Sequence, residues 1–238
     1  MNILITGGSS GLGKAIVEAL SLNEDHHVYF TYNHHSEEAE TLISGNVTAI
    51  KCNFTNTDEV NHLIELIPTF DLDVLVNNVY VGAPQGKHFH KTDSNEFLKS
   101  FEENILPTIS ISQAAINVFR KKKFGKIINV LTAYLINLPP IGFAIYTSNK
   151  GYLLQLSKTW NSEYRKFNIT SNCISPDFML TNVTKSVDER IIEQMQEEHP
   201  LKKILTPAEV AESVLFLIHA SQQLNGTNMV INASKNIV

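Results

Sequence analysis

The chain has 238 residues, 43% of them hydrophobic, and a formal net charge of −5. This length and apolar content suffice for one large α/β domain with a substantial core. The negative balance gives no general attraction for nucleic acid or an anionic membrane, and no apolar segment approaches spanning length. Met1 leads directly into the first expected strand without a signal region, so a cytoplasmic protein is expected.

Short apolar runs alternate with segments of helical periodicity along the chain. The expected strands are residues 2–6, 27–32, 47–52, 73–77, 126–131, 169–174 and 228–232. The expected helices cover residues 13–21, 57–67, 94–120, 147–166 and 207–219.

Strands that alternate with helices pair in parallel through right-handed crossovers, and the helices cover both faces of the sheet. The pattern therefore predicts a Rossmann-type, doubly wound α/β fold with a mostly parallel seven-stranded sheet. No repeat or linker divides the chain, so residues 1–238 are expected to form one domain. In such a sheet the ligand site lies beyond the carboxyl ends of the strands.

A glycine-rich turn, Thr6-Gly-Gly-Ser-Ser-Gly-Leu-Gly13, follows the first expected strand and opens into a helical pattern. Glycine lets the backbone turn tightly and approach a pyrophosphate, whose charge the helix N-terminus stabilises. A glycine-rich turn can also serve turn geometry alone. The candidate cofactor contacts in this turn are Gly7, Ser9, Ser10, Gly11, Leu12 and Gly13.

The second expected strand ends at Tyr32-Asn33-His34-His35-Ser36. A site that selects NAD usually places an acid here, on the ribose 2′-hydroxyl. A neutral or weakly basic pocket accepts a 2′-phosphate instead, so NADP(H) is favoured over NAD(H), with Asn33 and Ser36 as candidate contacts. No arginine is present in this stretch, and an ordinary polar loop is the alternative.

Polar or turn-forming residues also follow the later strands. Such residues can bond the adenine edge, a ribose or a neighbouring backbone, or can serve only as turn residues. The candidate contacts after the third, fourth and sixth strands are Asn53, Phe54, Asn77, Asn78, Pro176, Met179 and Thr181.

Tyr146 and Lys150 are four residues apart, so they share one face of a helix. A lysine ammonium near a phenol stabilises the phenolate and lowers the tyrosine pKa from about 10. The phenol can then donate a proton to a ketone oxygen or, in reverse, accept one from an alcohol. A surface tyrosine with a solvated lysine is the alternative for an isolated pair.

Together these pieces resemble the short-chain dehydrogenase/reductase family, especially the branch of the 3-oxoacyl-(acyl carrier protein) reductases. The resemblance covers essentially the whole chain and follows the family's order. Its pieces are residues 6–13, Asn77-Asn78, Asn104, Tyr146-x-x-x-Lys150, residues 176–181 and a closing strand after Leu224-Asn225-Gly226. It implies that Tyr146 is the general acid/base and that Lys150 lowers its pKa and bonds the nicotinamide ribose. Asn104 would hold a water in a proton relay.

The resemblance also implies a hydroxyl that donates to the substrate oxygen. Counting from the strand that starts at Gly125 places Thr132 there, where the family usually has serine. Counting back from Tyr146 points instead to Ala133, which has no hydroxyl. The strand is the safer reference because the loop at Pro139–Gly142 can absorb an extra residue.

The chain departs from the family pattern at several positions. Tyr80 and Asp177 stand where the family has glycine, and Asn53 stands where it commonly has aspartate. These changes leave Tyr146 and Lys150 in place but predict a divergent member with an uncommon substrate.

The leading hypothesis is an NADP(H)-dependent oxidoreductase that interconverts a ketone and a secondary alcohol, both small molecules. A nucleotide-binding regulatory or scaffold protein without turnover is the main alternative, and an epimerase or dehydratase is another. By resemblance, residues from about 182 to 205 would form a substrate lid. The helices at about 98–120 and 147–166 would pair in a homodimer or homotetramer. No metal site is expected, because the histidines lie in polar stretches without a matching ligand pattern.

Overall fold

The computed structural model describes residues 1–83, 86–136, 138–181 and 187–235. Its seven strands form one sheet in the order β3-β2-β1-β4-β5-β6-β7, and every neighbouring pair is parallel. The strands are β1 (Asn2–Ile5), β2 (His27–Tyr32), β3 (Val47–Lys51), β4 (Val74–Asn77), β5 (Gly125–Val130), β6 (Ile169–Pro176) and β7 (Asn228–Ile231). The expected Rossmann-type α/β fold is confirmed.

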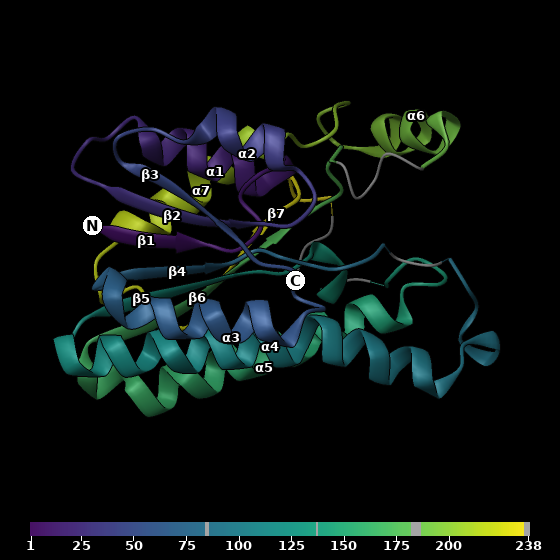
Figure 1. The fold of residues 1–238 in the computed structure, drawn as a ribbon. Helices are drawn as coiled ribbons and strands as arrows, with labels where there is room; N and C mark the ends of the chain where they lie inside the picture. The colour runs from purple at the N-terminus through teal and green to yellow at the C-terminus, as the bar shows by residue number, and fades with distance from the viewer. Residues whose placement is uncertain (84–85, 137, 182–186, 236–238) are drawn as a thin grey trace.

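Two layers of helices cover the sheet, as the doubly wound fold requires (Figure 1). One layer contains α1 (Gly11–Ser21), α2 (Ser36–Leu42) and α7 (Pro207–His219). The other contains α3 (Thr57–Leu66), α4 (Ser94–Lys122) and α5 (Ala144–Tyr164). The helix α6 (Glu189–Glu198) stands away from both layers, and 3-10 turns occur at η1 (Ile67–Phe70), η2 (Phe89–Lys91), η3 (Ala133–Leu135) and η4 (Arg165–Phe167).

The core is divided between the two faces of the sheet. Side chains alternate along a strand, so Ile3 and Ile5 of β1 pack in one cluster while Leu4 packs in the other. Phe30 is buried on the first face and Phe119 on the second. Every residue of β5 and of β6 is buried, as expected of parallel strands that are covered on both sides.

A buried lysine joins the sheet to α7. Lys126 lies in β5 and is 5% exposed, and its Nζ donates to the Ile218 carbonyl at 2.7 Å and to the Ala220 carbonyl. These carbonyls lie at the carboxyl end of α7, in its last turn and at its C-cap residue, where a helix leaves acceptors without internal donors. Burial lowers the pKa of Lys126. The lysine therefore acts as a cap supplied from the sheet.

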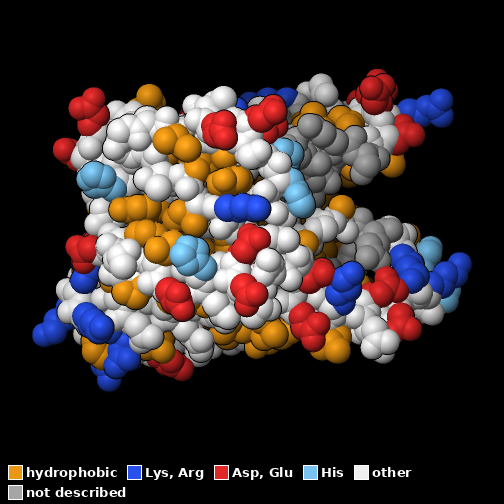
Figure 2. Space-filling model, in the orientation of Figure 1, with side chains coloured by type: hydrophobic (Ala, Val, Ile, Leu, Met, Phe, Trp, Pro, Cys, Tyr) orange, Lys and Arg blue, Asp and Glu red, His pale blue; other side chains and the backbone are white. Residues whose placement is uncertain are grey.

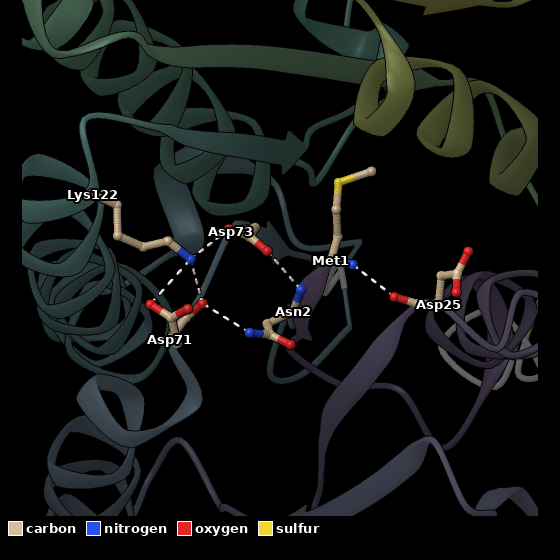
Figure 3. A network of polar contacts seen from close by, with 6 residues as sticks. All are labelled: Met1, Asn2, Asp25, Asp71, Asp73 and Lys122. Atoms are coloured by element: carbon tan, nitrogen blue, oxygen red, sulfur yellow. Dashed lines mark hydrogen bonds and ion pairs between the residues drawn. The ribbon is translucent and has the colours of Figure 1, made fainter.

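Polar contacts fasten the amino ends of the strands (Figure 3). Lys122, at the end of α4, pairs with Asp73 at 2.6 Å and with Asp71 at 3.1 Å. The backbone N–H of Asn2 donates to the Asp73 carboxylate at 2.8 Å, and the amine of Met1 donates to a backbone carbonyl. This network holds β1 beside the start of β4, at the edge of the sheet opposite the carboxyl ends.

Three further observations concern the described residues. Cys52 and Cys173 are free and buried. No group of three or more potential metal-ligating side chains occurs in the described part of the chain. None of the described helices combines the length and apolar character needed to cross a membrane.

Candidate active site

A cleft of about 400 Å³ opens at the carboxyl ends of the strands. It lies near the switch point where β1 and β4 meet, because the chain order reverses there. The surface is hollowed on the side between α6 and the start of α4 (Figure 2). The cleft runs from the glycine turn to α5 and is lined by Gly7, Ser10, Gly11, Leu12, Asn78, Val79, Tyr80, Ala83, Gly86, Val130, Leu131, Thr132, Tyr134, Phe143, Tyr146, Lys150, Pro176, Asp177, Phe178, Met179, Thr181 and Val187.

The glycine turn has the shape that a dinucleotide needs. Gly7 and Gly11 have positive φ angles of 71° and 52°, which favour glycine. A Cβ on Gly13 would lie 1.9 Å from the Gly7 carbonyl oxygen, so the turn has no room for a side chain there. Thr31 fixes the turn to β2, because its hydroxyl accepts from the Gly7 N–H at 2.9 Å.

The start of α1 suits an anion. Its first turn contains no acidic residue, and the side chain of Ser10, the N-cap residue, makes no capping hydrogen bond. Of the described residues lining the cleft, only Asp177 is acidic. The turn and helix therefore fit the pyrophosphate of a dinucleotide, with Ser10, Gly11 and Leu12 on the cleft wall.

Ten of the predicted cofactor contacts line the cleft: Gly7, Ser10, Gly11, Leu12, Asn78, Tyr146, Lys150, Pro176, Met179 and Thr181. Asn78 closes the turn, since its Nδ2 donates to the Thr6 carbonyl at 3.0 Å and to the Gly7 carbonyl at 3.1 Å. Ser9 is buried and, like Gly13, lies within the turn but off the lining.

Three other predicted contacts have side chains engaged elsewhere. The Asn77 amide donates to Asn129 at 2.9 Å inside the core. The Asn53 side chain accepts from the backbone N–H and the hydroxyl of Thr55 in a local turn. Phe54 is 5% exposed and packs in the core cluster that contains Leu4. These side chains lie off the lining of the cleft.

The end of β2 also lies off the lining. Asn33 follows the strand, and Ser36 is the first residue of α2. The first turn of α2 contains two exposed acids, Glu37 and Glu38, and the His35 ring lies 3.4 Å from Glu38. Residues 32–36 at the end of β2 therefore contain no acid, as the NADP(H) preference assumes, but α2 brings two acids close behind them.

Tyr146 and Thr132 meet in the cleft from different elements. Tyr146 lies in the first turn of α5, and Thr132 follows β5. Both side chains line the cleft, and the Thr132 hydroxyl accepts from the Tyr134 N–H at 3.3 Å. Ala133 begins η3 and lies off the cleft lining. The position counted from the strand is thus the one that places a hydroxyl beside Tyr146.

The pKa values differ from the sequence expectation. Burial, as the largest cause, raises the pKa of Tyr146 well above its ordinary value, and Tyr80 and Tyr134 raise it further, while the Thr132 hydrogen bond opposes the shift. Burial lowers the pKa of Lys150 to about 8. The net shift of the Tyr146 pKa is therefore upward, opposite to the expected direction, because burial outweighs the effects that favour the phenolate, and Tyr146 is protonated at neutral pH.

Lys150 is 3% exposed and is held at the base of the cleft. Its Nζ donates to the Val130 carbonyl at 2.7 Å and lies 5.9 Å from the centre of the Tyr146 ring. The two side chains lie on one face of α5, as their spacing predicts.

Asn104 lies in α4, is 3% exposed and positions the loop after β4. Its Oδ1 accepts from the Val81 N–H at 2.6 Å, and its Nδ2 donates to the Ser100 carbonyl at 3.0 Å. Its own carbonyl accepts from the Thr108 hydroxyl at 2.7 Å. The side chain therefore fixes the backbone that leads away from Tyr80, and the water relay stays a prediction.

Tyr80 occupies the centre of the site. Its ring makes a T-shaped contact with the Tyr146 ring, and the two ring centres are 4.8 Å apart. The Lys150 Nζ lies 5.3 Å from the centre of the Tyr80 ring. Its hydroxyl lies 3.5 Å from the Ser100 Oγ. The Asn149 amide donates to the same Oγ at 2.9 Å.

Asp177 brings a carboxylate to the far wall of the cleft. Lys235 pairs with it at 3.7 Å. Burial, assisted by the Asp177 charge, raises the pKa of Tyr134 to about 12. Tyr134 packs edge to face on Phe143, with centres 5.4 Å apart. Sequence reasoning did not identify these two aromatic residues, because no local spacing connects them.

Two loops meet at the mouth of the cleft. Gly142 has a φ of 87°, and a Cβ there would lie 2.3 Å from the Cα of Gly86. Beside them is a second cavity of about 240 Å³, which shares Tyr80 and Tyr146 with the cleft.

The expected lid is described only in part, because residues 182–186 lie outside the described residues. Val187 lines the cleft. In α6 none of the residues is buried, and Ile191 is 47% exposed. The lid function stays a prediction.

Comparisons with known proteins agree with this geometry. The family model described as enoyl-(acyl carrier protein) reductase matches residues 7–233. The relative MabA of Mycobacterium bovis, a 3-oxoacyl-(acyl carrier protein) reductase, is 28% identical over 221 residues, covering 91% of this chain and 84% of the relative. FabG of Rickettsia prowazekii, which has the same enzyme name, is 28% identical over 233 residues, covering 96% and 94%.

Solved structures are also similar. A protein described as a short chain dehydrogenase/reductase family protein is 25% identical, with a TM-score of 0.84 and coverage of 98% of this chain and 96% of the other. ElxO with NADP bound is 27% identical, with a TM-score of 0.85 and coverage of 98% of each chain. The family model, the relatives and the fold show that the chain belongs to the short-chain dehydrogenase/reductase family of NAD(P)-dependent oxidoreductases, in the branch of the 3-oxoacyl-(acyl carrier protein) reductases.

Proposed function

We propose that this chain is an NADP(H)-dependent oxidoreductase that interconverts a ketone and a secondary alcohol, with Tyr146 as general acid and base. The observation that carries the proposal is that Tyr146, Lys150 and Thr132 line one cleft that continues to the glycine turn. Two hydroxyls from different elements thus lie in one cleft, where a carbonyl oxygen can sit between them.

The proton chemistry follows from the pKa directions. Tyr146 is protonated at neutral pH because its pKa is raised, so it can donate to a carbonyl oxygen. Thr132 donates a hydrogen bond to the same oxygen. A bound nicotinamide supplies the hydride for the carbonyl carbon. The buried Lys150 ammonium stabilises the phenolate that remains after proton transfer, since charges interact strongly away from water.

Several residues would hold the dinucleotide. Gly7, Ser10, Gly11 and Leu12 face its pyrophosphate, and Lys150 is available to a ribose hydroxyl at the other end of the cleft. NADP(H) is preferred over NAD(H) in this proposal, because no carboxylate ends β2 to repel a 2′-phosphate. The NADP named with the similar ElxO structure supports the same choice.

The substrate class to test first comes from the relatives. MabA and FabG are named for reduction of 3-oxoacyl chains, which are ketones one carbon removed from a thioester. Tyr80, Tyr134 and Phe143 line the cleft near Tyr146, so an apolar chain beside the reacting carbonyl suits its walls.

A homodimer or homotetramer stays a prediction, as does a cytoplasmic location. On the helices expected to pair, Leu98, Leu106 and Tyr152 expose 56%, 46% and 43% of their surface. Leu153 and Trp160 of α5 are instead buried within the chain. The apolar surface that is left on α4 and α5 supports self-association, and light scattering at micromolar concentration tests it: a monomer contradicts the prediction.

The function is tested by oxidation of NADPH and NADH with a panel of ketones that includes a 3-oxoacyl thioester. Turnover is expected with NADPH, and Tyr146→Phe should reduce it by about 100-fold or more, because it removes the proton donor. Tyr164→Phe is the matched control: it makes the same change at the far end of α5. Cofactor binding that persists without turnover on the whole panel would favour the binding-protein alternative.

A further inference from the structure

Tyr80 contacts both Tyr146 and Lys150, which are named below as the proton-transfer pair. It follows β4, whereas Tyr146 and Lys150 lie on α5. Its ring makes a T-shaped contact with the Tyr146 ring and faces the Lys150 Nζ. Its hydroxyl lies 3.5 Å from the Ser100 Oγ, to which the Asn149 amide also donates, so these contacts fix the outer end of the ring.

The surroundings of Lys150 explain why this ring matters. The ammonium carries three N–H donors, and in the described residues one donates to a protein acceptor, the Val130 carbonyl. Two phenol rings stand over the Nζ, at 5.3 Å for Tyr80 and 5.9 Å for Tyr146. The face of an aromatic ring attracts a cation within about 6 Å, and the attraction is strongest where water is excluded.

We propose that Tyr80 is a positioning residue for the proton-transfer pair: its ring face holds the Lys150 ammonium charged and its T-shaped contact fixes the rotamer of Tyr146. The inference rests on the proposed function, because it assigns a purpose to a neighbour of the groups named there. Ser100 and Asn149 are the anchors that keep the ring from turning away.

The direction of the effect follows from the charge. Burial lowers the pKa of Lys150 because it disfavours the charged ammonium. The face of the Tyr80 ring attracts the ammonium and so raises this pKa. Loss of the ring is therefore expected to lower the pKa of Lys150 further. The Tyr80 hydroxyl orients the ring through its contact with Ser100, whereas the ring face alone contacts the Lys150 ammonium. The variants leave the other titratable groups around the cluster unchanged: Tyr134 and Asp177 on the cleft wall, Cys173 inside β6, and Lys87, Glu96, Lys99 and Glu103 around the second cavity.

The first measurement needs no substrate. NMR titration of lysine side chains labelled with ¹³C at Cε gives the pKa of Lys150, with the signal assigned by its loss in Lys150→Met. Tyr80→Leu is expected to lower that pKa by about one unit, and Tyr80→Phe, which keeps the ring, by less than about 0.3 unit. An equal pKa in wild type and Tyr80→Leu overturns the inference.

A second pair of variants keeps the shape of the ring and so protects the test from misfolding. Phenylalanine and pentafluorophenylalanine at position 80 have nearly the same outline, but fluorination reverses the charge of the ring face. The fluorinated ring is expected to lower the Lys150 pKa by at least as much as Tyr80→Leu. Identical titrations with the two rings also overturn the inference.

Turnover provides an independent reading with the fastest ketone of the panel. Loss of the ring is expected to lower kcat about tenfold at pH 7.5, with KM changed less than about threefold and the basic limb of the pH profile moved to lower pH. Tyr80→Phe should recover most of the rate. A rise in KM alone, with kcat and the limb unchanged, would show that Tyr80 is only a wall of the pocket.

Tyr146→Phe, measured in parallel, separates this inference from the proposed function. Loss of turnover in Tyr146→Phe with no effect in the Tyr80 series rejects the positioning role alone. Full turnover in Tyr146→Phe rejects the proposed function and the positioning role with it. Tyr164→Leu controls for the loss of a partly buried tyrosine away from the site.

Discussion

The carbonyl oxygen of Gly7 occupies the space in which a side chain on Gly13 would begin, because a Cβ there would lie 1.9 Å away. Gly7 lies in the turn that follows β1, and Gly13 lies in the first turn of α1. The contact sets how closely the helix approaches the strand, and therefore where the N–H groups of the helix start are aimed. It connects the backbone geometry of the turn directly to dinucleotide binding.

Gly13→Ala is therefore expected to lower the free energy of unfolding by about 1–3 kcal/mol, because helix and strand must separate to admit the methyl group. Dinucleotide binding should weaken at least tenfold for the same reason. Urea unfolding and fluorescence titration with NADPH measure the two effects. Gly45→Ala is the control, since nothing lies within 4 Å of its added Cβ; equal behaviour of the two variants contradicts the argument.

Thr132 is expected to act through its hydroxyl. Thr132→Val keeps the shape and removes the donor, and should lower kcat about 100-fold, the usual cost of one donor to a developing oxyanion. Thr132→Ser should keep kcat within about fivefold, because the hydroxyl remains. Steady-state kinetics with a saturating ketone decide the matter. A valine variant as active as the serine variant would remove Thr132 from the mechanism.

The pH profile of ketone reduction should show Lys150. The lysine is charged below its lowered pKa of about 8 and neutral above it. Tyr146 keeps its proton through this range because its own pKa is raised. We therefore expect kcat to be constant at low pH and to fall as pH rises through about 8. The activity that remains in Lys150→Met should not fall in this pH range, because the titrating group is gone. A wild-type kcat that stays constant to pH 9.5 contradicts the assignment of this fall to Lys150.

Lys126 should contribute to stability from outside the site. Lys126→Met leaves the carbonyls of Ile218 and Ala220 without their donor in a buried place. Buried unpaired acceptors cost about 1–3 kcal/mol, so the free energy of unfolding should fall by that amount. Lys121→Met is the control at an exposed lysine of α4. Urea midpoints that move equally in both variants show that the cap is unimportant.

The elements that bury continuous apolar stripes could be predicted from sequence. All seven strands occur at the expected places, since their runs are short, apolar and separated by turns. Boundaries were less certain: α1 begins at Gly11 and α5 at Ala144, earlier than expected, because the first turn of a helix has no complete period. The helix α2 was missed because it buries only Ala39.

In the site, the parts that depend on local spacing could also be predicted. Tyr146 and Lys150 share a helix face, and the glycine turn meets the cleft. Contacts between distant residues could not be read in the same way. Asn77 bonds Asn129, which lies 52 residues away, and the pKa of Tyr146 is raised first by burial and then by Tyr80 and Tyr134, which come from other segments.

The contact between Gly86 and Gly142 has a consequence for how the substrate range of this protein can change. The Gly86 backbone occupies the space that a side chain on Gly142 would need, whereas a Cβ on Gly86 would meet nothing within 4 Å. The constraint therefore runs in one direction: volume added at position 142 must displace the loop that contains Gly86. Selection or engineering for another ketone is thus expected to keep glycine at position 142, and libraries that vary this position alone should yield mostly inactive variants.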